Sequence, residues 1–147
     1  MSTLTSKEKR KARIITLQVV FAHELNGSEL DDTCKFMMDT GIPPSKDVIK
    51  YGKRLSNLVF MYEVEVDKLI KKRSKNWDFD RITLIDKLIL RMALVEMIHM
   101  DEVPLKVSIV EGVEIAKQFS TEDSSSFING ILDAIYNEMV KKKENTV

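Results

Sequence analysis

The chain has 147 residues, and its 23 basic and 23 acidic side chains give a formal net charge of zero. This length is typical of one domain with a substantial core, and a composition of 44% hydrophobic and 31% charged residues excludes a disordered chain. The polar, basic start and the lack of any run of eighteen apolar residues favour a cytoplasmic protein over a secreted or membrane-spanning one. Cys34 is the only cysteine, which excludes an internal disulfide and a cysteine-rich zinc site.

Apolar residues recur at helical spacing along the chain, and no segment alternates like a strand, so the predicted fold is all-α. The first helix is expected to begin at Thr5, which forms a capping box with Glu8, and to end at Gly27. A second helix is expected over residues 28–40, before a loop at the two prolines of residues 42–44.

A long apolar stripe between Ser45 and Ser74 predicts a third helix, and a break in it near Tyr62 stays open. A soft boundary near residue 75 is expected to divide the domain, residues 1–147, into two small helical bundles. The next helix carries an apolar set from Ile82 to Ile98.

Two more helices follow the turn at residues 101–104. A capping box at Ser108 and Glu111 predicts the start of the first, which ends near Phe119. The last is expected from residues 123–126 to roughly Val140, followed by a polar tail over residues 141–147. The sequence thus predicts six or seven helices.

Catalytic signals are weak. The two histidines, His23 and His99, are distant in sequence, and the chain has no glycine-rich phosphate loop and no metal-ligand spacing. We therefore expect neither an enzyme nor a cofactor or metal. His99 is interpreted as a hydrogen-bonded or helix-capping residue and Cys34 as a small buried hydrophobe.

The strongest local charge is the run KEKRKAR at residues 7–13, with five positive charges and one negative. Lys9 and Arg13 lie one helical turn apart, and Arg10 and Lys11 broaden the positive surface, as phosphate binding requires. On charge alone, a solvated helix end is the simpler interpretation, since short basic runs are common. However, positive charge at a helix N-terminus opposes the macrodipole, so the run is locally unfavourable and calls for another reason. Smaller basic runs lie at residues 71–75 and 141–143.

The stretch EVPLKVSIVEGVEIAKQFSTEDSSSFINGILDA at residues 102–134, together with KRKARIITLQVVF at residues 9–21, resembles the NusB family of bacterial transcription antitermination factors. The resemblance implies a small helical RNA-binding protein that is not an enzyme. It also implies a partner, the small-subunit ribosomal protein NusE, with which the family binds single-stranded boxA RNA in ribosomal RNA leader transcripts and joins the antitermination complex of RNA polymerase. A homodimer stays open.

Several residues match the RNA-facing positions of the family. Phe21 stands where relatives often have Tyr and either stacks on a base or packs in the core. Asp123 and Ser124 are interpreted either as helix caps or as direct RNA contacts. The implied RNA-binding residues are Lys9, Arg10, Lys11, Arg13, Phe21, Lys106, Asp123 and Ser124.

A second set matches the surface that binds the ribosomal protein in the family. Its two phenylalanines are expected to be at least partly buried, and its aspartates also suit the first turn of a helix. The set is Asp80, Asp86, Arg91, Phe119 and Phe127.

The chain departs from the family at Val110 and Gly112, within a stretch that typically reads Ile-Asn-Glu-Ala. The change removes an Asn amide and places glycine inside a helix. Two alternatives to antitermination stay open: an RNA-binding helper of a ribosomal RNA methyltransferase, and a helical interaction protein with no RNA role.

Overall fold

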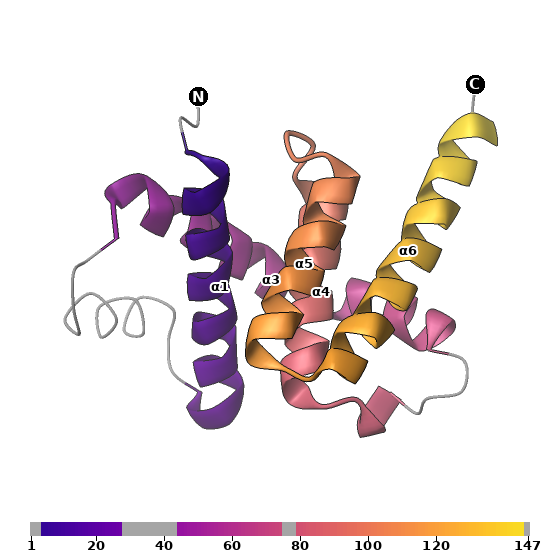
Figure 1. The fold of residues 1–147 in the computed structure, drawn as a ribbon, viewed down its shortest axis with the longest axis horizontal. Helices are drawn as coiled ribbons and strands as arrows, with labels where there is room; N and C mark the ends of the chain where they lie inside the picture. The colour runs from indigo at the N-terminus through magenta and orange to yellow at the C-terminus, as the bar shows by residue number, and fades with distance from the viewer. Residues whose placement is uncertain (1–3, 28–43, 75–78, 146–147) are drawn as a thin grey trace. The chain divides into compact units, whose positions relative to one another are not determined.

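The computed structural model describes residues 4–27, 44–74 and 79–145. Within these ranges the chain is all-α, as predicted, with five α-helices and one short 3-10 helix (Figure 1). The helix predicted over residues 28–40, with Cys34 in it, lies outside the described residues. The chain groups into two compact units, Met1–Met61 and Tyr62–Val147. Their division falls earlier than the boundary predicted near residue 75.

The first helix, α1 (Ser6–Asn26), has the predicted ends. The Thr5 hydroxyl accepts a hydrogen bond from the Glu8 backbone N–H at 3.1 Å, and the Glu8 carboxylate accepts one from the Thr5 N–H at 3.2 Å. Gly27 ends the helix with a φ of 70°, in the left-handed region that glycine adopts without strain. The capping box and the glycine stop are therefore confirmed.

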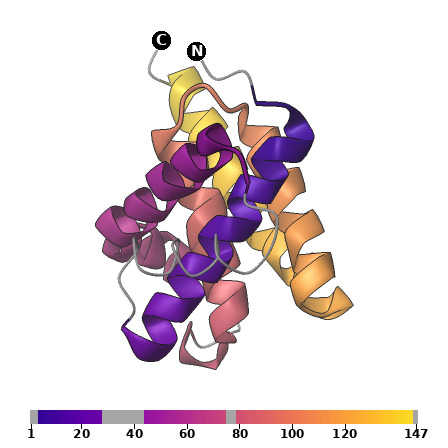
Figure 2. The same ribbon diagram turned by 90° about the vertical axis from the view of Figure 1, so that its left-hand side faces the viewer.

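In the first unit, α1 crosses the first half of α3 (Lys46–Arg73), as both ribbon views show (Figures 1 and 2). Gly52 allows the close approach, since a Cβ there would lie 3.4 Å from the Ala12 carbonyl oxygen and from Ile15 Cγ2. The buried Thr16 hydroxyl lies 3.1 Å from the Gly52 carbonyl oxygen, to which it donates. This contact satisfies a polar group that burial would otherwise penalise.

The break that the sequence left open near Tyr62 is present. Tyr62 leaves helical geometry, with φ −112° and ψ 16°, and two helical stretches meet there. In the second unit its ring stacks on His99, with centroids 3.6 Å apart and planes at 15°. His99 Nε2 is buried and lies 3.5 Å from a Glu65 carboxylate oxygen, outside hydrogen-bond geometry. His99 stands in the last turn of α4, as the capping interpretation expects, and its ring also stacks on Tyr62.

The second unit continues with η1 (Phe79–Arg81), α4 (Leu84–His99), α5 (Leu105–Phe119) and α6 (Glu122–Asn145). α5 packs against both α4 and α6. Gly112 of α5 lies where the three helices meet. A Cβ on it would lie 3.3 Å from Ala93 Cβ of α4 and 3.4 Å from Leu132 Cδ1 of α6. The glycine that departs from the family pattern therefore permits close approach of three helices.

The predicted start of α5 was wrong, and that of α6 was one residue late. α5 begins at Leu105, behind Pro104, so Ser108 lies inside the helix, where its hydroxyl donates to the buried Glu96 carboxylate at 2.7 Å. Ser108, which matches the pattern of a capping box, therefore forms a contact between α5 and α4 and not a helix cap. α6 begins at Glu122, and the Thr121 hydroxyl caps it by accepting from the Ser124 N–H at 3.0 Å.

The last helix runs past the predicted end at Val140 to Asn145, so much of the expected polar tail is helical. Its Glu138 carboxylate accepts hydrogen bonds from Arg73 and, at 3.3 Å, from Lys72. These contacts join the end of α3 to α6. They also give a structural role to Lys72 and Arg73, two basic residues of the run at residues 71–75. No helix of the described residues combines the length and apolarity needed to cross a membrane.

Candidate nucleic-acid interface

The basic residues of α1 differ in how far they are buried. Arg10 and Lys11 are exposed and Lys9 is half-buried, so these three cations can reach a phosphate. Arg13 is only 3% exposed, and its guanidinium carbon lies 5.9 Å from the centre of the Tyr51 ring. This cation–π geometry gives Arg13 a packing role within the first unit. Contact between Arg13 and RNA would require the side chain to leave that ring.

Phe21, also on α1, is half-buried. Partial burial is compatible with both predicted roles, core packing and base stacking.

Lys106 lies in the first turn of α5 and is exposed, and its Nζ sits 5.8 Å from the centre of the Tyr136 ring of α6. Asp123 is exposed and Ser124 half-buried in the first turn of α6. Because Thr121 caps that helix, the capping role predicted for Asp123 and Ser124 is wrong. Thr121 is the residue that the sequence analysis missed, and its signal was a hydroxyl three residues before Ser124.

The residues predicted to bind a protein partner differ in exposure. Asp80 is exposed, Phe119 is 40% exposed and Phe127 is half-buried, as expected for a contact surface. Asp86 and Arg91 are only 5% and 7% exposed. Most of the surface of each of these two residues is therefore buried within the second unit.

Both buried residues are held by contacts inside the second unit. Arg91 Nε donates to Asp67 Oδ1 at 2.8 Å and Arg91 Nη2 to Asp67 Oδ2 at 3.0 Å, while Glu63 lies 3.2 Å from Nη1. The Ser120 hydroxyl donates to Asp86 Oδ1 at 2.8 Å and so fixes the end of α5 to the start of α4. The ion pairs of Arg91 and the hydrogen bond of Asp86 therefore link helices inside the second unit.

A cavity of about 190 Å³ brings members of the two predicted sets together. It contains Asp123 and Ser124 from the RNA set and Asp86 and Phe127 from the partner set. Its lining residues are Arg81, Ile82, Thr83, Asp86, Asp123, Ser124 and Phe127.

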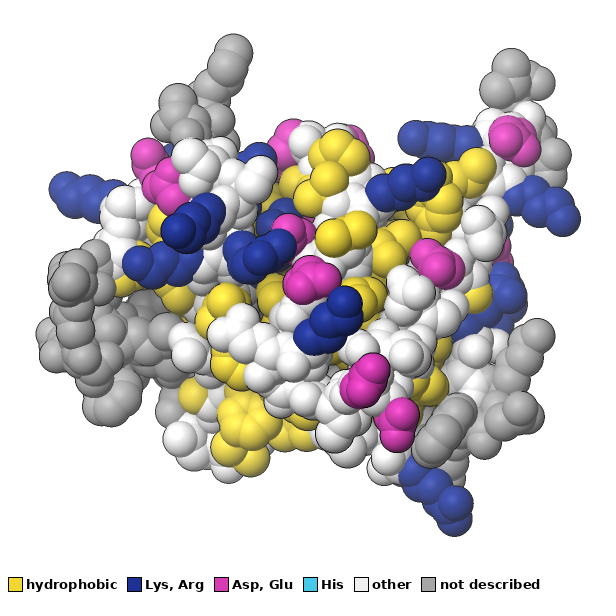
Figure 3. Space-filling model, viewed as in Figure 1, with side chains coloured by type: hydrophobic (Ala, Val, Ile, Leu, Met, Phe, Trp, Pro, Cys, Tyr) yellow, Lys and Arg dark blue, Asp and Glu magenta, His cyan; other side chains and the backbone are white. Residues whose placement is uncertain are grey.

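A larger groove, of about 610 Å³, lies between the start of α5 and the end of α6 and contains Lys106. Hydrophobic side chains lie over α5 and between α5 and α6, with basic side chains among them (Figure 3). The sequence analysis did not select Tyr136, Val140 and Lys143, the residues of α6 that line this groove. Their helical spacing, which ends in the basic run at residues 141–143, is the pattern that could have indicated them. No group of three or more His, Cys, Asp or Glu in the described ranges could hold a metal ion.

Comparison with known proteins gives the family. The model of the NusB family matches residues 10–137. The chain belongs to the NusB family. A relative 37% identical over 134 residues is the transcription antitermination protein NusB of Chloroherpeton thalassium (strain ATCC 35110 / GB-78). The match covers 91% of this chain and 64% of the relative, so the chain spans somewhat less than two thirds of that protein.

Solved structures share the fold. NusB of T. maritima is 28% identical, with a TM-score of 0.79 and coverage of 94% of each chain. A chain in the crystal structure of the antitermination factors NusB and NusE in complex with dsRNA is 23% identical, with a TM-score of 0.79. That match covers 90% of this chain and 98% of the other. The all-α NusB fold is thus established for this chain.

Proposed function

We propose that this NusB family protein is a transcription antitermination factor that binds boxA RNA of ribosomal RNA leader transcripts together with ribosomal protein NusE. It acts by binding and not by catalysis. The observation that carries the proposal is the match to the family over residues 10–137, with a relative named as an antitermination protein.

The accessible cations of α1 support an RNA-binding role. Lys9, Arg10 and Lys11 gather positive charge in the second turn of α1. Phosphate contact supplies a reason for that arrangement. Lys106 adds a further accessible cation in the second unit.

Exposure supports a smaller set of partner contacts than the one that the family resemblance implies. We propose that Asp80, Phe119 and Phe127 contact NusE, while Asp86 and Arg91 act indirectly by holding the helices that carry them. Partly exposed aromatics and an exposed acidic side chain suit a basic ribosomal protein.

Neither surface needs to bind tightly alone. When two weak contacts are linked in one assembly, the second forms at a high effective concentration. The assembly can then be tethered to RNA polymerase through nascent RNA, which gives a binding protein an effect on transcription.

The test is calorimetry on the three pairings of this protein, NusE and boxA RNA, followed by the ternary mixture. We expect NusE to raise RNA affinity and RNA to raise NusE affinity by the same factor, because linkage is reciprocal. A boxA RNA with scrambled sequence is the control.

Independent binary affinities in the ternary mixture would contradict the adaptor mechanism. RNA binding that is enhanced by a ribosomal RNA methyltransferase and not by NusE would indicate the helper role instead. A complete lack of RNA binding would favour the remaining alternative, a helical interaction protein with no RNA role.

A further inference from the structure

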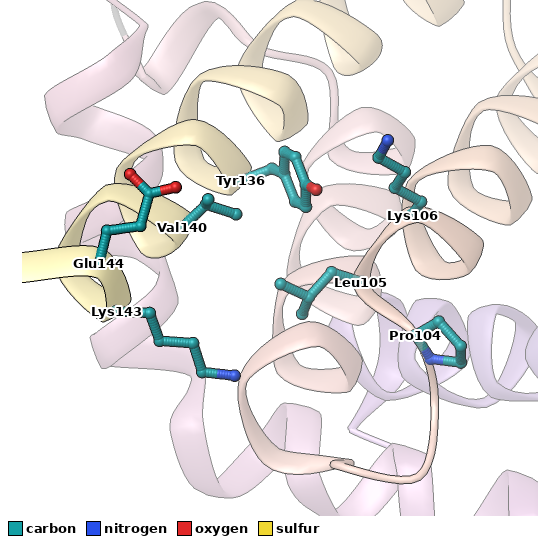
Figure 4. A pocket seen from close by; sticks show the side chains of 7 residues that line it. All are labelled: Pro104, Leu105, Lys106, Tyr136, Val140, Lys143 and Glu144. Carbon is teal, nitrogen blue, oxygen red and sulfur yellow. The ribbon is translucent and has the colours of Figure 1, made fainter. Parts of the chain in front are cut away.

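The groove between α5 and α6 combines an aromatic ring, an apolar floor and lysines. Figure 4 shows Tyr136 and Val140 of α6 facing Leu105 and Lys106 of α5, with Lys143 directed toward Leu105. Its volume of about 610 Å³ lies within the range of roughly 300–1,000 Å³ that small-molecule sites occupy. The space is therefore sufficient for a nucleotide.

Charge around the groove favours a polyanion. Lys106 stands on one wall and Lys143 on the other, and two further exposed lysines precede Lys143 along α6, outside the lining. Glu144 also lines the groove, with its carboxylate beside Val140, so the lining carries two lysines against one glutamate (Figure 4). A single-stranded nucleic acid carries one negative charge per nucleotide and can meet cations on both walls.

We propose that the α5–α6 groove is a binding site for single-stranded RNA, in which one base stacks on Tyr136 while Lys106 and Lys143 bind the flanking phosphates. The proposal rests on the proposed RNA-binding function and adds the end of α6 to it. Leu105 and Val140 supply the apolar floor on which the edge of the base lies.

Lys106 must give up its place over the Tyr136 ring for a base to stack on that face. An exposed cation–π contact contributes only about 0.5–1 kcal/mol. Stacking of a base on an aromatic side chain contributes about 1–3 kcal/mol. The exchange is therefore favourable, and it releases Lys106 toward a phosphate.

The test uses the full chain and fluorescein-labelled 12-nucleotide oligouridylate in anisotropy titrations at several salt concentrations. Tyr136→Leu keeps apolar bulk and removes the ring, so it should weaken binding about 5- to 100-fold, as loss of one stacked base does. Tyr136→Phe keeps the ring and should bind as the wild type does. An abasic oligomer of the same length should not distinguish the three proteins.

Lys143→Gln should lower the slope of log affinity against log salt by about 0.7, the value for one phosphate of a single strand. Lys68→Gln, an exposed lysine of α3 outside the groove, is the matched control and should leave the slope unchanged. Circular dichroism melting curves verify that each variant is folded.

Crosslinking with 5-iodouridine in the oligomer locates the site directly. We expect a crosslink at Tyr136. Crosslinks confined to α1, with unchanged binding by Tyr136→Leu and Lys143→Gln, would overturn the groove site while the proposed function stands. Wild-type protein that binds neither this oligomer nor boxA RNA would contradict both. Unchanged RNA titrations together with Tyr136-dependent binding of an acidic leucine-rich peptide would assign the groove to a protein instead.

Discussion

Single charged residues show how far burial can differ among similar sequence positions. Arg10 and Arg13 belong to one basic run, yet the first is exposed and the second packs over Tyr51. Asp80 and Asp86 both lie in the first turn of a helix, yet one faces solvent and the other accepts a hydrogen bond from Ser120. We therefore propose Asp80, and not Asp86, for direct contact with a partner.

Charge reversal separates these two aspartates. Asp86→Lys places a cation in a buried first turn and leaves the Ser120 hydroxyl without its acceptor, so it should lower the free energy of unfolding by about 3 kcal/mol or more. Asp80→Lys is exposed and should change it by no more than about 0.5 kcal/mol. Urea denaturation of both variants measures the difference. Equal stabilities would show that Asp86 is accessible.

At the scale of elements, glycine inside a helix has two different consequences. Gly112 lies between α4 and α6, whereas a Cβ on Gly130 of α6 would meet nothing within 4 Å. Alanine is favoured over glycine in a helix by about 1 kcal/mol. Gly130→Ala should gain most of that stability.

Gly112→Ala should gain none of it, because the added methyl lies 3.3 Å from Ala93 Cβ, which is fixed to a buried helix. Thermal melting of the two variants forms a matched test. A higher melting temperature for Gly112→Ala than for Gly130→Ala would mean that α4 and α5 separate easily at this contact.

The contact between the end of α3 and α6 predicts a pH dependence. The Arg73 guanidinium, with Lys72 beside it, holds the pKa of the Glu138 carboxyl below its ordinary value. Since the folded pKa is the lower one, this ion pair stabilises the fold above the ordinary carboxyl pKa, and its stabilisation disappears as pH falls through the folded pKa.

Glu138→Gln should therefore be less stable than the wild type at pH 7 and equally stable in acid below the folded pKa. Urea denaturation from pH 7 to pH 2 measures this. Glu114→Gln, which removes an exposed pair with Lys117 within α5, is the control and should change stability less at pH 7. A difference that persists at pH 2 would point to packing and not to charge.

For the whole molecule, a net charge of zero means that RNA affinity depends on local patches. Replacing both Arg10 and Lys11 by Ala should lower the slope of log RNA affinity against log salt by about 0.7 for each phosphate that the variant no longer binds. Filter binding at increasing salt measures the slope. Lys50→Ala, on α3 of the same unit, should leave it unchanged; an unchanged slope in the double variant would remove α1 from the RNA surface.

The sequence by itself determined the helical class, the limits of α1, the long helix over residues 46–73, and the family, and it left the break near Tyr62 open. These features depend on local periodicity, capping side chains and glycine or proline stops, which neighbouring residues encode. The ordered resemblance at residues 102–134 identified the family without any knowledge of packing.

Tertiary structure alone decided which charged residues face water. Ser108 fits a capping pattern but bonds Glu96 on another helix, and Arg91 fits a surface position but binds Asp67. The groove likewise depends on the packing of α5 against α6, which brings Lys106 beside Tyr136. Such contacts join residues distant in the chain, so burial and hydrogen-bond partners follow from the packing of helices and not from local spacing.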